Sequence, residues 1–128
     1  MADRSQNADL IEAWINYHSL DMDSKDRERL FWAWEDFNAT IHKNPDQALK
    51  LILEVLDRNQ SPQILANLAA GPLEDLLVFH GSAIIDRVEK LARQAPMFRK
   101  LLGGVWKNDI ENDVWLRLEK FRVSLGDI

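Results

Sequence analysis

The sequence contains no cysteine among its 128 residues, which excludes disulfide bonds, thiolate nucleophiles and cysteine-ligated metal sites together. Serine and threonine are scarce, and no segment resembles the nucleophile elbow of a hydrolase. Its three histidines, His18, His42 and His80, are never three or four residues from one another, which argues against a helical metal site. We therefore expect a protein with no catalytic residues, no metal and no cofactor.

Two further absences bear on location and fold class. No apolar run approaches the roughly 18 residues that span a bilayer, and residues 1–7 are polar where a signal peptide would be apolar. We expect residues 1–7 to be disordered and the protein to be cytoplasmic, without a membrane segment. No alternating apolar pattern and no Asn-Gly or Asp-Gly hairpin is present, so we expect no β-strand.

What the sequence does contain is helical periodicity along nearly its whole length. It predicts helices over 8–20, 25–42, 45–58, 62–70, 72–80, 82–95 and 96–102, and a last helix from 112 or 113. Gly71 and Gly81 are expected to end helices. We predict an all-α fold, a single domain over 1–128 with seven to eight short helices. Because Pro62 and Pro96 lie 34 residues apart in similar contexts, a HEAT-like α-solenoid of stacked helix pairs is the alternative.

The predicted helix 45–58 is the centre of this arrangement. Asn44 can cap it, and Pro45 suits its first position. Its apolar residues cover well over half of the circumference: Ala48, Leu49, Leu51, Ile52, Leu53, Val55 and Leu56. A helix that is apolar over so wide an arc must be covered on more than one side. We therefore predict a buried helix with its neighbours packed around it.

Three segments carry a resemblance to a known family. They are LANLAAGPLEDLL (65–77), IDRVE (85–89) and FRKLLGGVW (98–106), of which AAGPLED is the most specific. Over about residues 30–115 the chain resembles a family of small helical bacterial proteins of unknown function. The resemblance implies a bacterial, helical, standalone protein and brings no activity with it.

The charge is unevenly distributed. The formal net charge is −5, and residues 1–58 hold 12 acids against 7 bases, whereas residues 59–128 hold equal numbers. In the predicted helix 25–42, an inward stripe consists of Leu30, Trp34, Phe37 and Ile41. Trp32 points to the opposite side, where its neighbours are Glu28, Glu35 and Asp36. An exposed tryptophan among acids is typical of an interface that attracts a basic partner.

We therefore predict a non-catalytic protein-binding module. Its most concrete form is a small acidic bacterial immunity or inhibitor-type protein that neutralises a basic protein. An acidic chain repels nucleic-acid phosphate, so we expect no nucleic-acid partner. Alternatively, another helix or a second copy of the chain in a homodimer covers Trp32.

The competing function is an enzyme or small-ligand binder with a site at the Gly71–Asp75 corner. The adjacent acids Glu74 and Asp75 are the most enzyme-like feature, and Asn67 and Trp106 would complete a pocket. However, acids in a first helical turn also stabilise the helix N-terminus, and adjacent residues project about 100° apart. A polar cavity at this corner would favour the ligand site, and an exposed Trp32 in an acidic patch would favour the protein binder.

Overall fold

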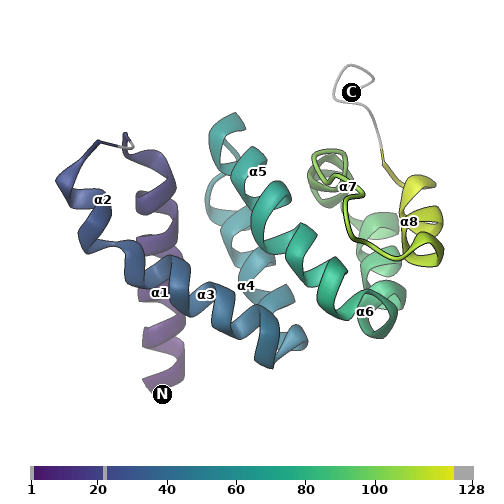
Figure 1. The fold of residues 1–128 in the computed structure, drawn as a ribbon, viewed down its shortest axis with the longest axis horizontal. Helices are drawn as coiled ribbons and strands as arrows, with labels where there is room; N and C mark the ends of the chain where they lie inside the picture. Colours follow the sequence, from purple (N-terminus) through teal and green to yellow (C-terminus); the bar gives the residue numbers. More distant parts are fainter. Residues whose placement is uncertain (1, 22, 123–128) are drawn as a thin grey trace.

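The computed structural model describes residues 2–21 and 23–122, with side chains from Ala8 onward within those ranges. These residues form eight α-helices and one π-helical turn, and none of them forms a β-strand. The elements are α1 (Ala2–Ser19), α2 (Lys25–Arg29), α3 (Phe31–Lys43), α4 (Pro45–Arg58), α5 (Pro62–Leu68), the π turn η1 (Ala69–Leu73), α6 (Glu74–Gln94), α7 (Pro96–Leu102) and α8 (Asn112–Glu119). Figure 1 shows α1, α2 and α3 at one end of the molecule, and α7 and α8 at the other. The predicted all-α single domain is confirmed.

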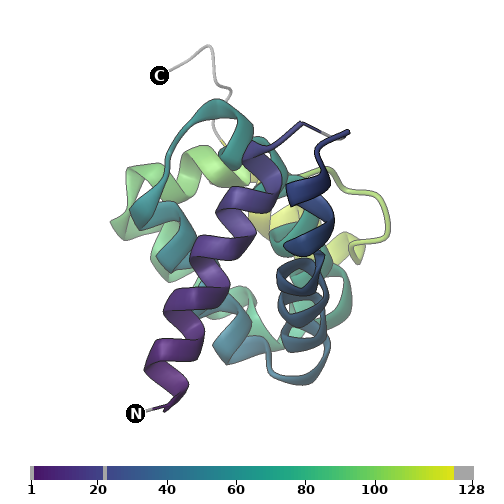
Figure 2. The same ribbon diagram turned by 90° about the vertical axis from the view of Figure 1, so that its left-hand side faces the viewer.

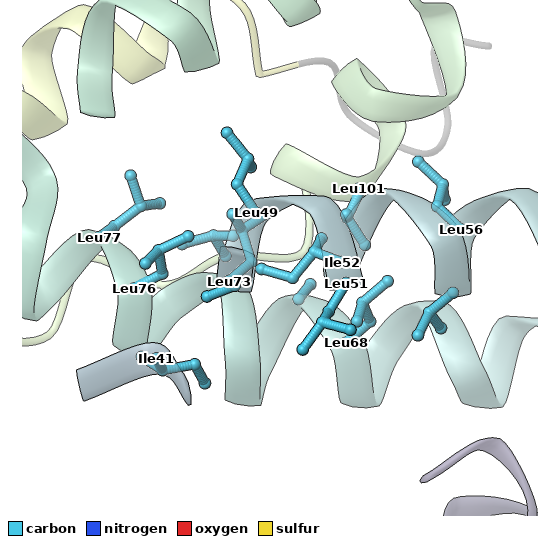
Figure 3. Close-up of a cluster of buried hydrophobic side chains, with 14 of the residues drawn as sticks. Ile41, Leu49, Leu51, Ile52, Leu56, Leu68, Leu73, Leu76, Leu77 and Leu101 are labelled. Carbon is cyan, nitrogen blue, oxygen red and sulfur yellow. The ribbon is translucent and has the colours of Figure 1, made fainter. Parts of the chain in front are cut away.

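Helix α4 lies at the centre of the hydrophobic core. Asn44 Oδ1 accepts a hydrogen bond from the Gln47 N–H at 3.1 Å, which caps the helix start. The buried side chains of α4 are Ala48, Leu49, Leu51, Ile52, Val55 and Leu56. Figure 3 shows Leu49, Leu51, Ile52 and Leu56 beside leucines of α5, η1 and α6, and α1 and α3 pack against α4 as well. The prediction of a helix covered on several sides is confirmed, except that Leu53 is only half-buried, beside Lys50 at the rim.

The helix contacts follow the order of the helices along the chain. Helix α1 packs on α3, α4 and α5, and α6 packs on α3, α4, α7 and α8. In a solenoid each helix pair likewise contacts the neighbouring pairs. The HEAT-like stack that the 34-residue spacing of Pro62 and Pro96 indicated therefore stays a prediction.

The helix does not end at Gly71, and this corrects a prediction. No described glycine has a positive φ angle, and α5, η1 and α6 form one continuous helical rod. Pro72 lies inside the rod, where it has no N–H to donate and its ring would clash with the carbonyl four residues earlier. The helix therefore widens over Ala69–Leu73, and the Glu74 N–H donates to the Ala69 carbonyl, five residues back.

The expected stop at His80 and Gly81 is a kink. His80 has non-helical angles (φ −134°, ψ 18°), after which α6 continues to Gln94. The rod from Pro62 to Gln94 is therefore 33 residues long. By length and composition alone it could cross a membrane. This corrects the expectation that no stretch of the chain is long and apolar enough to do so. Half of its most apolar stretch is buried inside the protein, as is usual for a central core helix.

The N-terminal third differs from the prediction at two places. The backbone is helical from Ala2, six residues before the predicted start at Ala8 and through the segment expected to be disordered. The helix predicted over 25–42 is divided at Leu30, whose angles (φ −99°, ψ 0°) turn the chain between α2 and α3. No glycine or proline marks this turn. Figure 2 shows α1 in front, with α2 and α3 alongside it.

Two arginines, Arg117 and Arg122, hydrogen-bond the C-terminal third of the chain to the preceding helices. Arg117 of α8 donates to Glu89 and to Asp86 of α6, the latter at 2.6 Å. This contact lowers the pKa of Glu89, chiefly through the Arg117 hydrogen bond. Arg122 donates to the carbonyls of Leu102, the last residue of α7, and of Gly103 and Val105, which follow it. These bonds satisfy carbonyls that a helix end leaves free.

Candidate functional site

The first candidate surface is the acidic aromatic face, which we define as Glu28, Trp32, Glu35 and Asp36. All four side chains are exposed, and Trp32 retains 42% of its accessible surface. Helix α3 turns Ala33, Phe37 and Ile41 into the core, so positions 32, 35 and 36 must point to its other side. Trp32 and Asp36 line the same surface hollow. Glu28 lies on α2, before the turn at Leu30, and lines a separate hollow with Tyr17, Arg27 and Phe31. The structure therefore places Trp32 with the acids of α3, and the grouping of Glu28 with them stays a prediction.

Among the side chains that the structure describes, no ion pair involves the acids of this face, Glu28, Glu35 and Asp36. Lys43 lines the same hollow as Trp32 and Asp36. The arginines of α2 are engaged elsewhere: Arg29 pairs with Asp26, and the Arg27 Nε donates to the Tyr17 carbonyl at 3.2 Å. The face consequently keeps its negative potential toward solvent.

Aromatic side chains continue beside the acidic aromatic face. Phe31, with 42% of its surface exposed, stacks on Trp34 with ring centroids 5.4 Å apart and an interplanar angle of 11°. Tyr17 of α1 approaches Phe31 at 6.0 Å. Trp34 was predicted in the core stripe and is instead 40% exposed, because Ala33 occupies the centre of the buried side and Trp34 lies at its margin.

The Gly71–Asp75 corner holds a cavity of about 220 Å³. Asn67 and Asp75 line it, as the competing prediction required. Its other walls come from α1, α3 and the π turn: Trp14, His18, Trp34, Phe37, Asn38, Ile41, Ala70, Gly71 and Pro72. The sequence did not indicate the aromatic wall, because residues from helices far apart along the chain form it. The one signal was Pro72, whose position inside a helical pattern is compatible with a bulge.

Glu74 and Trp106, the other two residues of that prediction, do not line the cavity. Glu74 Oε1 accepts from the Trp106 N–H at 3.2 Å, and its Oε2 accepts from the Asn108 Nδ2 at 2.8 Å. These bonds hold the loop before α8, in which Asn108 has a positive φ angle of 38°. Trp106 is 72% exposed and borders a separate, more apolar groove of about 480 Å³ that also includes Lys100. The predicted four-residue pocket is therefore wrong in half of its members.

Two side chains that line the cavity, Asp75 and His18, have pKa values shifted from their ordinary ones. Burial, with a smaller effect from Glu74, raises the pKa of Asp75, while His42 partly opposes that rise. Burial, together with the positive charge of Arg27, lowers the pKa of His18 to about 4. At neutral pH the imidazole of His18 is therefore uncharged, so it adds no positive charge to the wall that holds Asp75.

The fold and these surfaces define a single-domain all-α protein with an exposed acidic aromatic face and one aromatic-lined cavity. The chain matches DUF6869, a family of unknown function, over residues 20–125, and it belongs to that family. The comparisons with curated proteins and with solved structures found no match. The match extends beyond the region of about 30–115 over which the sequence resembled a family of unknown function.

Proposed function

We propose that this protein is a non-catalytic binding module that captures a basic protein on its acidic aromatic face. The observation that carries the proposal is the exposure of Trp32 on α3 beside Glu35 and Asp36, which have no ion-pair partners in the described part of the chain. A tryptophan can bury a large apolar area on a partner at low entropic cost, and unpaired carboxylates attract and orient a positively charged surface.

The concrete form of the proposal is a small cytoplasmic bacterial protein of the immunity or inhibitor type. Its support is the net charge of −5, concentrated in residues 1–58, and the position of the exposed Phe31, Trp32 and Trp34 in that same acidic part. Such a protein covers the basic working surface of its target. The proposal requires no chemistry from its own side chains.

Capture of a partner from the native host tests the proposal with matched tryptophan variants. The bait is the full chain as wild type, Trp32→Ala or Trp106→Ala, since both tryptophans are exposed and Trp106 lies outside the acidic aromatic face. We expect the wild type and Trp106→Ala to retain the same basic protein and Trp32→Ala to lose it. Equal retention by all three baits, or a retained partner of acidic isoelectric point, would contradict the proposal.

Charge variants test separately whether the carboxylates of the acidic aromatic face attract the partner. The double variant Glu35→Gln/Asp36→Asn removes two charges from the face, and Asp109→Asn/Asp113→Asn removes two exposed charges from the region of α8. Loss of steering charges slows association and weakens its dependence on salt. We expect slower association and a weaker salt dependence for Glu35→Gln/Asp36→Asn and not for Asp109→Asn/Asp113→Asn. The association rate of the captured partner at low and high ionic strength measures both effects.

A further inference from the structure

We propose that the cavity between α1, α3 and the π turn binds a small primary ammonium that carries a compact apolar or aromatic group. This inference does not rest on the protein-binding proposal, because the cavity and the acidic aromatic face are formed by different side chains. Three features of the cavity carry it: its size, the space left by the π turn and the chemistry of its walls.

The size of the cavity sets the size of the ligand. A dry cavity of about 150 Å³ in another protein accommodates benzene, and this one measures about 220 Å³. It has room for one ring and a short head group. The apolar walls include Trp14 and Phe37, whose ring centroids are 5.5 Å apart, and Trp34 at the exposed margin. Such walls favour an aromatic or compact aliphatic body over a polar one.

At Gly71 the π turn contributes no side chain to the wall of the cavity. Pro72 widens the helix at Ala69–Leu73, and Gly71 in this turn has no side chain. A Cβ built on Gly71 would meet no other atom within 4 Å, so the space beside it is open. Single π turns occur frequently at functional sites in helices. Here the turn brings Gly71 and Asp75 to the same cavity as α1 and α3.

The polar groups of the cavity favour a cation that donates hydrogen bonds. Asp75 supplies a half-buried carboxylate, and neither lysine nor arginine lines the cavity. The Asn67 Nδ2 donates to the Gln63 carbonyl at 2.9 Å, which leaves Asn67 Oδ1 as an acceptor. An ammonium can donate to the Asp75 carboxylate, and the aromatic side chains that line the cavity attract a cation as well. An anion would be repelled by the Asp75 carboxylate, and no lysine or arginine lines the cavity to offset that repulsion.

Benzylamine is the probe, with benzyl alcohol and benzoate as its neutral and anionic counterparts of similar shape. Binding to the full chain is followed by two-dimensional NMR, in which the five tryptophan indole N–H groups report on separate places. We expect benzylamine to shift the Trp14 and Trp34 signals saturably and to bind about tenfold more tightly than benzyl alcohol, a difference of ~1.4 kcal/mol. Benzoate should bind least tightly.

Two neighbouring acids provide the matched variants. Asp75→Asn keeps the shape and removes the charge, so benzylamine should bind about tenfold more weakly while benzyl alcohol is unaffected. Glu74→Gln removes the adjacent charge outside the cavity and should change both affinities by no more than about twofold. Gly71→Leu places a side chain in the open space and should abolish binding of both probes.

Several results would overturn the inference. They are binding of benzoate as tight as that of benzylamine, equal effects of Asp75→Asn and Glu74→Gln, and shifts confined to Trp106 and Trp115. Absence of saturable benzylamine binding would overturn it as well. If Asp75→Asn fails to fold, the ranking of the three probes on the wild-type chain decides the matter. Because Trp32 does not line the cavity, failure here leaves the protein-binding proposal standing, and the reverse also holds.

Discussion

Truncation of Ile52 in α4 measures how tightly the core surrounds this helix. Ile52 is fully buried, with α3, the π turn and α6 packed against α4. Replacing a buried isoleucine with alanine removes three carbons and leaves a cavity, which costs about 2 to 5 kcal/mol. Because rigid helices pack on several sides of α4, little relaxation is available. We expect a loss of about 3.5 kcal/mol in the free energy of unfolding.

The adjacent Leu53 is the matched control for this prediction. Leu53→Ala also removes three carbons from α4, but Leu53 is half-buried at the rim, so we expect a loss of only about 1 kcal/mol. For a chain of 128 residues the unfolding entropy is about 0.27 kcal/mol/K near the midpoint, so the two variants should melt ~13 °C and ~4 °C below wild type. Urea titration followed by tryptophan fluorescence and circular dichroism provides both free energies. Equal losses for the two variants, or a loss below about 1 kcal/mol for Ile52→Ala, would refute the reasoning.

Three further predictions follow from the cavity and the π turn. Gly71→Ala should raise the free energy of unfolding by about 0.5 to 1 kcal/mol, because residue 71 lies in a helical turn and has space for a methyl group. An unchanged or lower urea midpoint would be inconsistent with an open turn. Gly104→Ala should lower it by about 1 to 3 kcal/mol, since the new Cβ would lie 2.9 Å from the Ala69 Cβ; wild-type stability in the same titration would rule out that close approach. The imidazole of His18 should titrate by NMR with a pKa near 4, lowered by burial and then by Arg27, so the protein loses stability as the pH falls from about 6.5 toward 4. His18→Phe, which keeps an aromatic ring without a titrating group, should lose less stability over that range, and an ordinary histidine titration in the wild type would contradict the burial of this ring.

The sequence predicted those parts of the fold that depend on local signals. The wide apolar arc of α4, with Asn44 and Pro45 at its start, identified the central helix and its bounds. Pro96 and Gly103 marked the two ends of α7 in the same way. In these segments the capping residues and the apolar periodicity indicate the same structure, which makes the prediction reliable.

The errors occur where tertiary packing overrides a local signal. Gly71 and Pro72 usually end a helix, yet the helix continues through both, because one widened turn accommodates the proline and the flanking residues are held in the core. The turn at Leu30 has no glycine or proline to indicate it. Trp34 lies one position from Ala33, and which of the two occupies the centre of the interface depends on how closely α1 approaches.

The two candidate sites also differ in how far local sequence signals could predict them. Trp32, Glu35 and Asp36 lie on consecutive turns of α3, so helical periodicity was sufficient to group them, whereas the turn at Leu30 removes that argument for Glu28. The cavity combines α1, α3 and the π turn, which lie far apart in the sequence. Only Asn67 and Asp75, both from the rod, were predicted for it. Glu74 holds a loop instead, a role that depends on the position of Asn108, 34 residues away.

Photo-crosslinking from position 32 tests the central claim most directly. A photoreactive benzoylphenylalanine replaces Trp32 in one sample and Trp106 in another, both exposed in the free protein. After irradiation in the native host, crosslinked proteins are identified by mass spectrometry. We predict a basic protein attached at position 32 and absent from position 106. Attachment of the same protein at position 106 alone, or of no protein at position 32, would contradict the assignment of the acidic aromatic face as the binding surface.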